Sequence, residues 1–503
     1  MTLAPAPASA PPPHPFNMAA HVLARSAQAP DKIALAVLGP ARADRWSYAR
    51  LESAVRGTAT GLLQSGLTAG DRVLMRLGNT PDFPITFLAC LAVDLVPVPT
   101  SPQLTSPEVT ALAHQLGPKV VVADDATPRP DHPAPVLTTD ILRTFHSLPP
   151  AGFVMGDPDR AGYIIFTSGT SGRPRGVIHA HRAIWARQMM MDGWYGLTSG
   201  DRMLHAGAFN WTYTLGTGLM DPWTMGATAL IPAAGTPPAM LPLLSKRHDA
   251  TIFAAAPGVY RQLLRAPMPS LPKLRHGLSA GEKLPDTVRA GWEDATGTPI
   301  FEAYGMSECS TFISASPTTP ADAGTLGPPQ PGRRVVLLED GSPAQSGEIA
   351  IHRDDPGLML GYLNAPEDTA ARFDGGYFRT GDLASLSPNG HIIYEGRADD
   401  MMNAGGYRVS PIEVETALAL HPNILEAAAV ELRVKSDASV IAAFYVADNV
   451  IDEDELAAHA AHYLARYKCP RLFIRVDALP RGANNKLLRR QLRQDWNARH
   501  GQT

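Results

Sequence analysis

The sequence predicts an α/β fold with two domains: a large N-terminal domain of α/β subdomains that includes a small antiparallel β-barrel-like part, and a small α+β C-terminal domain. Three observations support this prediction. Amphipathic helical patterns alternate with short β-branched runs through the first half of the chain, as in largely parallel sheets. From about Gly327 onward, strand-like runs are instead separated by Gly, Pro and Asp turns. The 503 residues also exceed the usual size of one hydrophobic core.

The first fifteen residues, MTLAPAPASAPPPHP, contain too much Pro and Ala to pack, and we expect a disordered tail at residues 1–15. The expected α/β elements then follow in order: strands at 32–37, 72–77, 96–99, 120–123 and 163–166, a helix at 181–191, strands at 228–231 and 251–254, and a helix at 258–264.

The second half contains expected antiparallel strands at 334–339, 347–352 and 391–395. The turn GRADD, residues 396–400, is the expected boundary between an N-terminal domain at 16–396 and a C-terminal domain at 397–503. Beyond it we expect a helix at 411–419, strands at 427–433 and 440–446, and further helices rich in Ala, Leu and Arg.

Composition narrows the function classes. The 44 Lys and Arg residues nearly balance 48 Asp and Glu residues, and the formal net charge of -4 gives no field that would attract nucleic acid or an anionic membrane. The three cysteines lack CxxC spacing, which suits a reducing cytoplasm. The most apolar segment, at 87–99, contains Asp94 and prolines and is too short to span a bilayer. We therefore expect a cytoplasmic protein with a small soluble substrate.

The most informative segment is YIIFTSGTSGRPRGVIHAHR, residues 163–182, which we interpret as a strand, a loop of glycines and hydroxyls, and a helix. Glycines let backbone N–H groups surround phosphate oxygens, and arginines offset their charge. The loop lacks the Walker A spacing, which argues against an ordinary P-loop ATPase. Its sequence TSGTSGRPRG resembles the phosphate loop of the adenylate-forming superfamily, which contains acyl- and aryl-CoA synthetases, luciferases and adenylation domains. Four further segments match that family in the correct order. For this loop, the resemblance implies ATP contacts from Thr167, Ser168, Gly169, Thr170, Ser171, Gly172 and Arg175, with Thr167 also catalytic.

The segment EAYGMSECS, residues 302–310, places an aromatic ring, a glycine, a hydroxyl and a carboxylate close together. Tyr304 offers a face for a purine, Ser307 can reach a phosphate, and Glu308 is a hard oxygen ligand of the kind that Mg²⁺ takes beside ATP. The resemblance implies the same roles and makes Glu308 catalytic. With the upstream segment SAGEKL, it implies further ATP contacts from Gly281, Glu282, Lys283, Glu302, Ala303, Gly305 and Met306.

FRTGDL at 378–383 and EGRADD at 395–400 contain Asp382 and Arg397, which the resemblance places on the ribose hydroxyls. Taken alone, each segment is more typical of a solvated turn. Asp399 falls on the hinge position of the family, about which its C-terminal domain moves between two half-reactions. Such a hinge needs only a few residues at the end of an element.

NAGGYRVSPIEVE, residues 403–415, resembles the strand and helix that meet the incoming thiol. Gly405 and Gly406 would let a pantetheine arm lie against the backbone, with Tyr407 and Arg408 completing the CoA-binding face, although the pair is equally typical of a bulge. The segment LPRGANNKLLRRQLR contains Lys486, the lysine that in this family neutralises charge where a carboxylate attacks the α-phosphate. The chain departs from the family in having Asn403 where many relatives carry lysine and Asn485 where glycine is usual.

The segment AFNWTYTLGTGL, residues 208–219, resembles the acyl-pocket region of aryl- and short-chain acyl-CoA ligases. Trp211 and Tyr213, with Gly281 and Met306, would form the acyl pocket, and two large rings favour a small aromatic or a short- to medium-chain acid. The same aromatics would also suit a plain core.

The resemblance implies an ATP-dependent acid:CoA ligase that uses ATP, Mg²⁺ and coenzyme A to make a carbon–sulfur bond through an acyl-adenylate. Two alternatives stay open: a stand-alone adenylation enzyme that loads a carrier protein, and a catalytically silent nucleotide-binding homologue. No nucleic-acid partner and no membrane span are expected, and a homodimer is left open.

Overall fold

The computed structural model describes residue 3 and residues 10–167, 174–404, 407–435, 438–482 and 487–500. By contacts between residues, the described chain divides into two compact units. The large unit contains Pro5–Val335 and Ile351–Phe378, and the small unit contains Met1–Ala4, Val336–Ala350 and the residues from Arg379 onward. The predicted boundary at residue 396 falls within the small unit and stays a prediction about folding domains.

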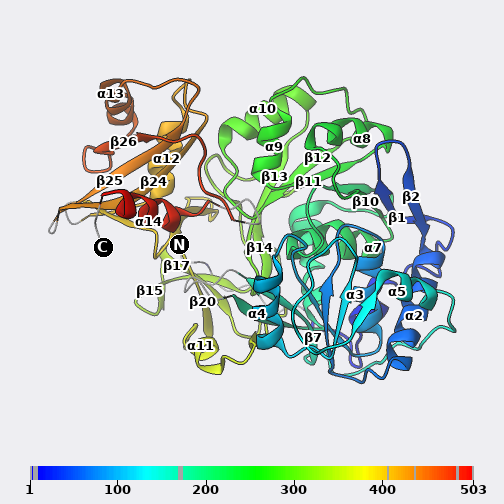
Figure 1. The fold of residues 1–503 in the computed structure, drawn as a ribbon. Helices are drawn as coiled ribbons and strands as arrows, with labels where there is room; N and C mark the ends of the chain where they lie inside the picture. The colour runs from blue at the N-terminus through cyan, green and yellow to red at the C-terminus, as the bar shows by residue number, and fades with distance from the viewer. Residues whose placement is uncertain are drawn as a thin grey trace. The chain divides into compact units, whose positions relative to one another are not determined.

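The large unit is built around an eight-stranded sheet (Figure 1). Its six central strands are parallel, and the two edge strands, β14 and β2, are antiparallel to their neighbours. In spatial order the strands are β14 (Ser310–Ser314), β13 (Ile300–Met306), β12 (His276–Ala280), β11 (Ile252–Ala255), β9 (Arg202–His205), β10 (Thr228–Pro232), β1 (Ile33–Leu38) and β2 (Ala43–Ser47).

The large unit also contains a second, fully parallel sheet. Its order is β4 (Val96–Pro99), β3 (Arg72–Arg76), β5 (Val120–Ala123) and β6 (Val136–Thr138). One hydrophobic core contains side chains of both sheets together with those of α1 (Met18–Val22), α2 (Tyr48–Gln64), α3 (Asp82–Ala92) and α5 (Thr139–Phe145). Helix α4 (Ser106–Leu116) packs on the other face of the second sheet. The large unit is therefore layered, with helices between two sheets, as alternating β and α segments require.

The two faces of the eight-stranded sheet differ. Helices α8 (Leu241–Arg247), α9 (Pro257–Leu263) and α10 (Asp286–Thr296) pack on one face, with η3 (Pro238–Met240) leading into α8. Part of the opposite face is covered by the π-helix η1 (Met191–Tyr195) and by Tyr213. Tyr213 directly precedes a second π-helix, η2 (Thr214–Met220), which continues into α7 (Asp221–Met225). π-Helices are rare and concentrate at functional sites.

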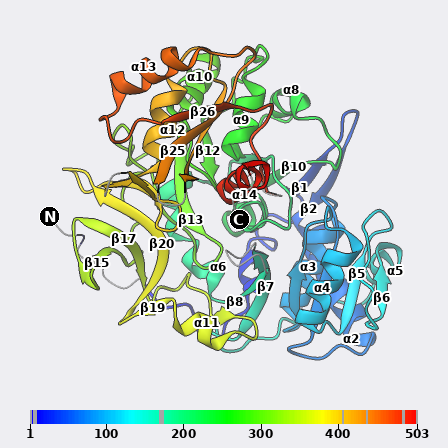
Figure 2. The ribbon, with the colours of Figure 1, turned by 60° about the vertical axis from the view of Figure 1, so that its left-hand side comes forward.

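The segment at 163–182 folds differently from the prediction. Strand β7 (Ala161–Thr167) contains the predicted strand, but the loop is followed by a second strand, β8 (Arg175–Ala180), antiparallel to β7 (Figure 2). The predicted helix at 181–191 is wrong in its extent, since the helix α6 spans only Ala183–Ala186. The β-branched Val177 and Ile178 favour a strand, and β7 supplies the backbone partners that a helix would otherwise provide internally.

The phosphate-loop candidate therefore spans the tip of a β-hairpin. A short strand, β18 (Gly361–Tyr362), pairs with the outer edge of β8 and is followed by α11 (Pro366–Ala370). Strand β19 (Phe373–Asp374) pairs with the first residues of β20 (Tyr377–Leu386).

Most of the next sheet lies in the small unit, and it contains β15 (Val335–Glu339), β16 (Ser342–Pro343), β17 (Ser346–His352), β20 and β21 (Ile392–Arg397). The pairs β15–β16 and β20–β21 are antiparallel, as is β19–β20. The predicted change from parallel to antiparallel strand pairing is therefore confirmed.

The C-terminal part of the small unit begins with the hairpin of β22 (Met402–Ala404) and β23 (Tyr407–Val409). A three-stranded sheet follows, formed by β24 (Glu426–Lys435), β25 (Ala438–Val446) and β26 (Leu472–Arg475). Helices α12 (Pro411–Ala419) and α13 (Glu453–Tyr463) share one core with this sheet, and α14 (Arg489–His500) contributes to another. The predicted α+β C-terminal part is thus confirmed.

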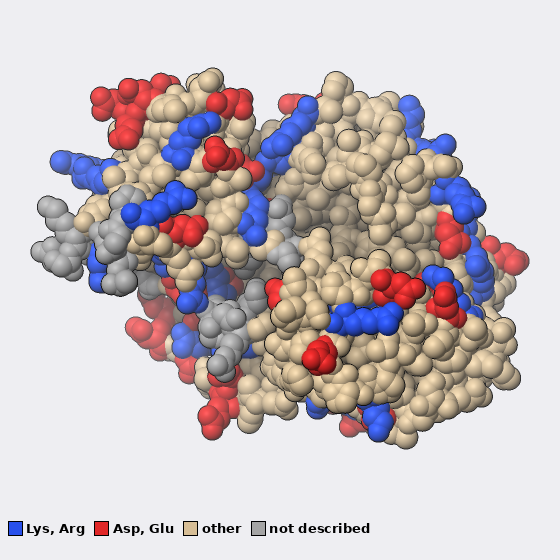
Figure 3. All heavy atoms as spheres, in the orientation of Figure 1, with Lys and Arg blue, Asp and Glu red and all other residues tan. Residues whose placement is uncertain are grey.

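The surface charge and the lengths of the helices agree with what the composition predicts. Acidic and basic side chains of the described residues are interspersed on the face shown in Figure 3. Among the described helices, none combines the length and the apolar character that crossing a bilayer requires.

Candidate active site

The two ends of the predicted phosphate loop are held opposite each other. Thr167 ends β7 and Arg175 begins β8, and the two are paired in the antiparallel register. The Thr167 hydroxyl donates to the Arg175 carbonyl at 3.5 Å. Ser168, Gly169, Thr170, Ser171 and Gly172 lie outside the described residues, so their predicted ATP contacts remain predictions.

Arg175 and Glu308, two predicted site residues far apart in the sequence, meet at one tyrosine. The Tyr362 hydroxyl donates to Oε1 of Glu308 at 2.7 Å. The Arg175 guanidinium lies over the same ring, 5.3 Å from its centroid, and pairs with Asp368 at 3.2 Å. The structure therefore brings the end of the phosphate loop and the predicted metal carboxylate together.

The backbone around Glu308 is fixed by contacts on several sides. The Met359 N–H donates to the Glu308 carbonyl at 2.8 Å. Ser310, the first residue of β14, adopts a left-handed backbone conformation with φ of 61°. A Cβ at Gly305 would lie 2.2 Å from the Ser310 carbonyl oxygen, so glycine is required where the two strands approach. The turn from β13 to β14 thus places Glu308 in a defined position.

Two buried arginines hold this turn. The Arg333 guanidinium pairs with Asp355 at 3.0 Å and donates to the Cys309 carbonyl at 3.1 Å. The Arg187 guanidinium pairs with Asp221 at 2.6 Å and donates to the Ser310 hydroxyl. Burial opposes the charge of each arginine, but the facing carboxylate raises the pKa of Arg333 and of Arg187 above the usual arginine value.

Sequence reasoning missed these arginines and Tyr362. Arg187 and Asp221 each stand in an otherwise apolar run, and an isolated charge in such a run is a usable signal for a buried pair. Nothing in the local sequence distinguishes Tyr362 from a core aromatic.

The buried Glu302 carboxylate binds groups of the protein itself. The carboxylate accepts from the Leu284 N–H at 2.7 Å and from Arg289 at 2.8 Å. Burial raises the pKa of this carboxyl, and Arg289 opposes that shift. Through these contacts Glu302 ties strand β13 to the segment that contains Gly281, Glu282 and Lys283. Ala303 is buried in β13, and the ring of the neighbouring Tyr304 packs edge-on against Phe312 with centroids 5.3 Å apart. Ser307 follows Met306, at which β13 ends, and is half-buried.

Three of the four predicted acyl-pocket residues form one cluster. The rings of Trp211 and Tyr213 are T-shaped at 5.1 Å, and a Cβ at Gly281 would lie 2.7 Å from the Trp211 ring. The Tyr213 hydroxyl donates to the Leu278 carbonyl at 3.0 Å, which fixes the second ring. Met306, the fourth, ends strand β13 beside β12.

In the small unit, Asp382 and Arg397 face each other across β20 and β21. The closest atoms of the ion pair are 3.8 Å apart, and the Tyr394 hydroxyl donates to Asp382 at 2.8 Å. Burial opposes ionisation of Arg397, but Asp382 and Asp399 raise its pKa. The two residues predicted on the ribose are thus adjacent on neighbouring strands.

Asp399, the predicted hinge residue, lies in the turn that follows β21 and accepts from Arg397 at 3.0 Å. Its neighbour Asp400 pairs with Arg493 at 2.7 Å and with Arg489 at 3.5 Å, both on α14. Arg489 also pairs with Glu415 on α12 at 2.7 Å. The turn is therefore fastened to the last helix by ion pairs.

The predicted CoA face begins in the hairpin of β22 and β23, where Tyr407 pairs with Ala404 and Arg408 with Asn403. Gly405, Gly406 and Lys486 lie outside the described residues. Arg481 and Leu487, on either side of the Lys486 segment, form an antiparallel bridge.

The residues present fit Mg²⁺ bound together with ATP. Among the described residues, no cluster of three or more His, Cys, Asp or Glu side chains could form an all-protein metal site. Glu308 is half-buried, and Tyr362 uses one of its two carboxylate oxygens. Mg²⁺ in nucleotide enzymes is typically held by one or two carboxylates, water and the substrate phosphates. Glu308 would supply the protein carboxylate.

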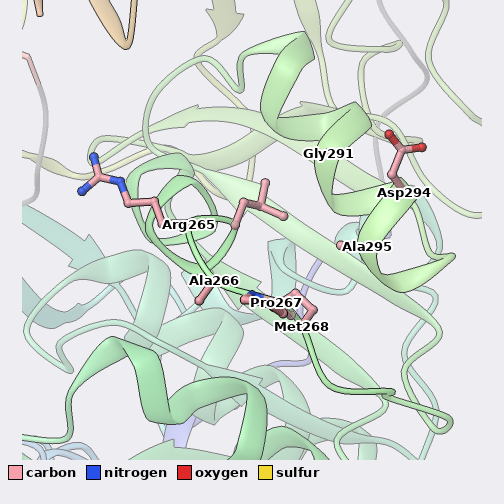
Figure 4. Close-up of a pocket in the computed structure, with 8 residues that line it drawn as sticks. Arg265, Ala266, Pro267, Met268, Gly291, Asp294 and Ala295 are labelled. Atoms are coloured by element: carbon pink, nitrogen blue, oxygen red, sulfur yellow. The ribbon is translucent and has the colours of Figure 1, made fainter. Parts of the chain in front are cut away.

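The pocket drawn in Figure 4 lies elsewhere on the large unit. Its residues come from the segment that follows α9 and from α10, and none of them belongs to the predicted sites. The residues that line this pocket are mainly apolar: Leu264, Arg265, Ala266, Pro267, Met268, Gly291, Asp294 and Ala295.

Comparisons with known proteins agree with the motifs. The family model described as AMP-binding enzyme matches residues 22–363, and the model described as AMP-binding enzyme C-terminal domain matches residues 413–486. A protein of Thauera aromatica named benzoate–CoA ligase is 32% identical over 90% of this chain and 91% of its own length. A protein of Aromatoleum sp. (strain CIB) named 3-hydroxybenzoate–CoA ligase is 29% identical over 91% of this chain and 93% of its own.

Among solved structures, a benzoate CoA ligase from Burkholderia xenovorans LB400 superposes with a TM-score of 0.86 and 26% identity, covering 95% of this chain and 100% of that one. The match extends over both parts of the fold. The chain therefore belongs to the AMP-binding enzyme family, the adenylate-forming superfamily that its motifs predicted.

Proposed function

We propose that this protein is an ATP-dependent acid:CoA ligase acting on a small aromatic acid, with a short- to medium-chain acid as the second choice. The observation that supports adenylation best is the meeting of Arg175 and Glu308 at Tyr362, because it joins the end of the phosphate loop to the predicted metal carboxylate. A cytoplasmic location and a homodimer, which the sequence allows, belong to the same proposal.

The first half-reaction joins the acid to AMP. A carboxylate oxygen of the acid attacks the α-phosphorus of ATP, and pyrophosphate leaves with the electrons of the broken P–O bond. Thr167, Arg175 and the loop between them bind the phosphates, Asp382 and Arg397 bind the ribose, and Lys486 offsets charge at the attacked phosphate. Mg²⁺ bound with ATP at Glu308 would supply further charge neutralisation.

The second half-reaction forms the thioester. The C-terminal domain predicted at 397–503 turns about Asp399, which withdraws Lys486 and presents the face from Gly405 to Arg408. The sulfur of coenzyme A, having lost its proton, attacks the acyl carbon, and AMP leaves. A rotation about a short turn is the usual form of such a hinge.

The cluster of Trp211, Tyr213 and Gly281 supports the aromatic substrate. Two large rings in contact at 5.1 Å occupy volume that a long chain would need, and relatives named as benzoate and hydroxybenzoate ligases are consistent with a compact acid.

Lys486→Ala tests the two-step assignment. We expect it to abolish pyrophosphate release, while synthetic acyl-adenylate is still converted to thioester at a rate near that of the unaltered enzyme. Gly406→Trp should do the reverse, because a bulky ring would obstruct the path of the pantetheine arm. Equal loss of both steps in Lys486→Ala would contradict the role of the lysine.

The alternatives are distinguished by the same assays. ATP/pyrophosphate exchange with acids from acetate and benzoate to long chains separates an enzyme from a silent homologue and identifies the acid. Thioester formation with free coenzyme A separates a CoA ligase from an enzyme that loads a carrier protein.

A further inference from the structure

We propose that Tyr362 is a positioning residue that orients the Glu308 carboxylate toward the metal–nucleotide complex and couples it to the Arg175 end of the phosphate loop. This inference rests on the proposed function, in which Glu308 binds Mg²⁺ together with ATP.

The contact between Tyr362 and Glu308 is short and directional. The phenol hydroxyl donates to Oε1 of Glu308 at 2.7 Å, so rotation of the carboxylate would break a hydrogen bond to a charged acceptor. A tyrosine hydroxyl carries its proton in the neutral range and can therefore donate. With Oε1 held, Oε2 has a fixed orientation for a ligand.

The tyrosine is itself held rigidly. Its backbone pairs with Val177 in β8, and its N–H donates to the Thr369 hydroxyl at 2.9 Å. That hydroxyl donates in turn to the Ala365 carbonyl at 2.9 Å. The side chain is only 6% exposed, so the ring has little freedom to follow a moving carboxylate.

The ring of Tyr362 also contacts Arg175, the residue that follows the phosphate loop and begins β8. The Arg175 guanidinium lies 5.3 Å from the ring centroid, and Asp368 holds it at 3.2 Å. A guanidinium over an aromatic face is attracted by the ring quadrupole. One side chain thus contacts both the residue at the end of the loop and the carboxylate that would hold the metal.

Tyr362→Phe tests this role because it removes the hydroxyl and retains the ring under Arg175. Partners that hold a metal ligand typically contribute about 10- to 100-fold to metal affinity. We expect the dissociation constant for Mn²⁺, measured by electron paramagnetic resonance in the presence of α,β-methylene-ATP, to rise about tenfold. The Mg²⁺ concentration for half-maximal ATP/pyrophosphate exchange should rise in parallel.

Tyr48→Phe is the matched control. The Tyr48 hydroxyl is also buried in the large unit and donates to the Ala227 carbonyl at 2.6 Å, but it contacts no predicted site residue. Its loss should lower thermal stability without changing Mn²⁺ affinity.

A double-mutant cycle with Glu308→Gln separates positioning from general packing. If Tyr362 acts through Glu308, Tyr362→Phe should change Mn²⁺ affinity little once Glu308 is already replaced. Unchanged affinity in Tyr362→Phe, or an equal loss in both backgrounds, would overturn the inference. If the unaltered protein failed to bind Mn²⁺ with the nucleotide, the proposed function itself would fall, and the inference with it.

Discussion

Gly281 lets Trp211 lie directly against the backbone of the predicted acyl pocket. Its φ of +102° belongs to a region that side chains with a Cβ rarely adopt, and a Cβ there would lie 2.7 Å from the Trp211 ring. The glycine therefore serves both the backbone turn after β12 and the position of the ring.

Gly281→Ala should displace Trp211 into the pocket. We expect kcat/KM for benzoate to fall by at least about tenfold relative to that for propionate, because one methylene group can change discrimination by about 10- to 200-fold. Gly297→Ala controls for backbone strain, since Gly297 also has a positive φ, +69°, but open space around its Cβ position. If the ratio of kcat/KM for benzoate to that for propionate is unchanged in Gly281→Ala, the assignment of Trp211 to the acyl pocket is contradicted.

Single residues differ in how far the sequence could predict them. Asp382 and Arg397 were predicted together from two motifs, and the strand register places them side by side. Glu302 was predicted to contact ATP, yet its carboxylate is engaged by Leu284 and Arg289, because the partners of a buried charge come from distant segments that a motif does not contain.

At the scale of elements, the turn from β13 to β14 depends on a buried ion pair that is remote in sequence. Arg187 donates to the Ser310 hydroxyl while Asp221, at the start of α7, holds the guanidinium. A Cβ at Gly216 in the π-helix η2 would lie 2.2 Å from the Arg187 Cζ, so this helix leaves space for the arginine.

Ser310→Ala should loosen the turn that contains Glu308. Both residue types have a Cβ, so the backbone strain at φ of 61° is similar, and the change removes mainly the contact with Arg187. We expect ATP/pyrophosphate exchange to slow by about tenfold, as for other partners that orient a ligand. Ser314→Ala on the same strand removes a hydroxyl that donates to Gly193 at 2.7 Å, and it should lower stability without this kinetic effect. Equal rates in the two variants would contradict the anchoring role.

Elements with strong local signals were predicted well, and those decided by pairing were not. Strands β4 and β5 and helix α12 have the predicted bounds, because β-branched runs and a Pro-initiated helix are local signals. The sequence predicts a loop and then a helix where the structure has strand β8, because the pairing with β7 that stabilises β8 is not visible in the local sequence. Nonlocal pairing of this kind leaves little trace in a short window of sequence.

On the scale of the whole molecule, the large unit buries several neutral histidines. Burial lowers the pKa of His179 to about 4, of His205 to about 3 and of His276 to about 4. In the unfolded chain these groups bind protons near the ordinary histidine pKa of about 6.5. Between that pH and about 4 the unfolded state binds more protons, so stability falls as the pH is lowered.

His205→Leu should reduce this acid sensitivity. Each such histidine costs up to about 1.4 kcal/mol per pH unit within the window, and both ring nitrogens of His205 lack a hydrogen-bond partner among the described residues. We expect the urea midpoint of the unaltered protein to fall more steeply between pH 7.5 and 5.5 than that of the variant. Parallel pH curves would show that His205 is already charged, or solvated, in the folded state.

The overall architecture could be predicted because the segments in which strands alternate with helices and the segments of antiparallel strands occupy separate stretches of the chain. The border between units is harder, since the contacts that group Val336–Ala350 with the residues from Arg379 onward join segments that are separate in sequence.

The ion pairs of Asp400 with Arg489 and Arg493 make the last helix a brace for the neighbouring turn. Helix α14 begins at Arg489, shortly after Lys486, so the braced turn and the lysine are joined both through the covalent chain and through charge. If the C-terminal part turns about Asp399 as proposed, the Asp400 turn and helix α14 would move together. Loss of the chain from Arg489 onward would remove both ion pairs of Asp400 while leaving the predicted ATP-binding residues of the large unit in place.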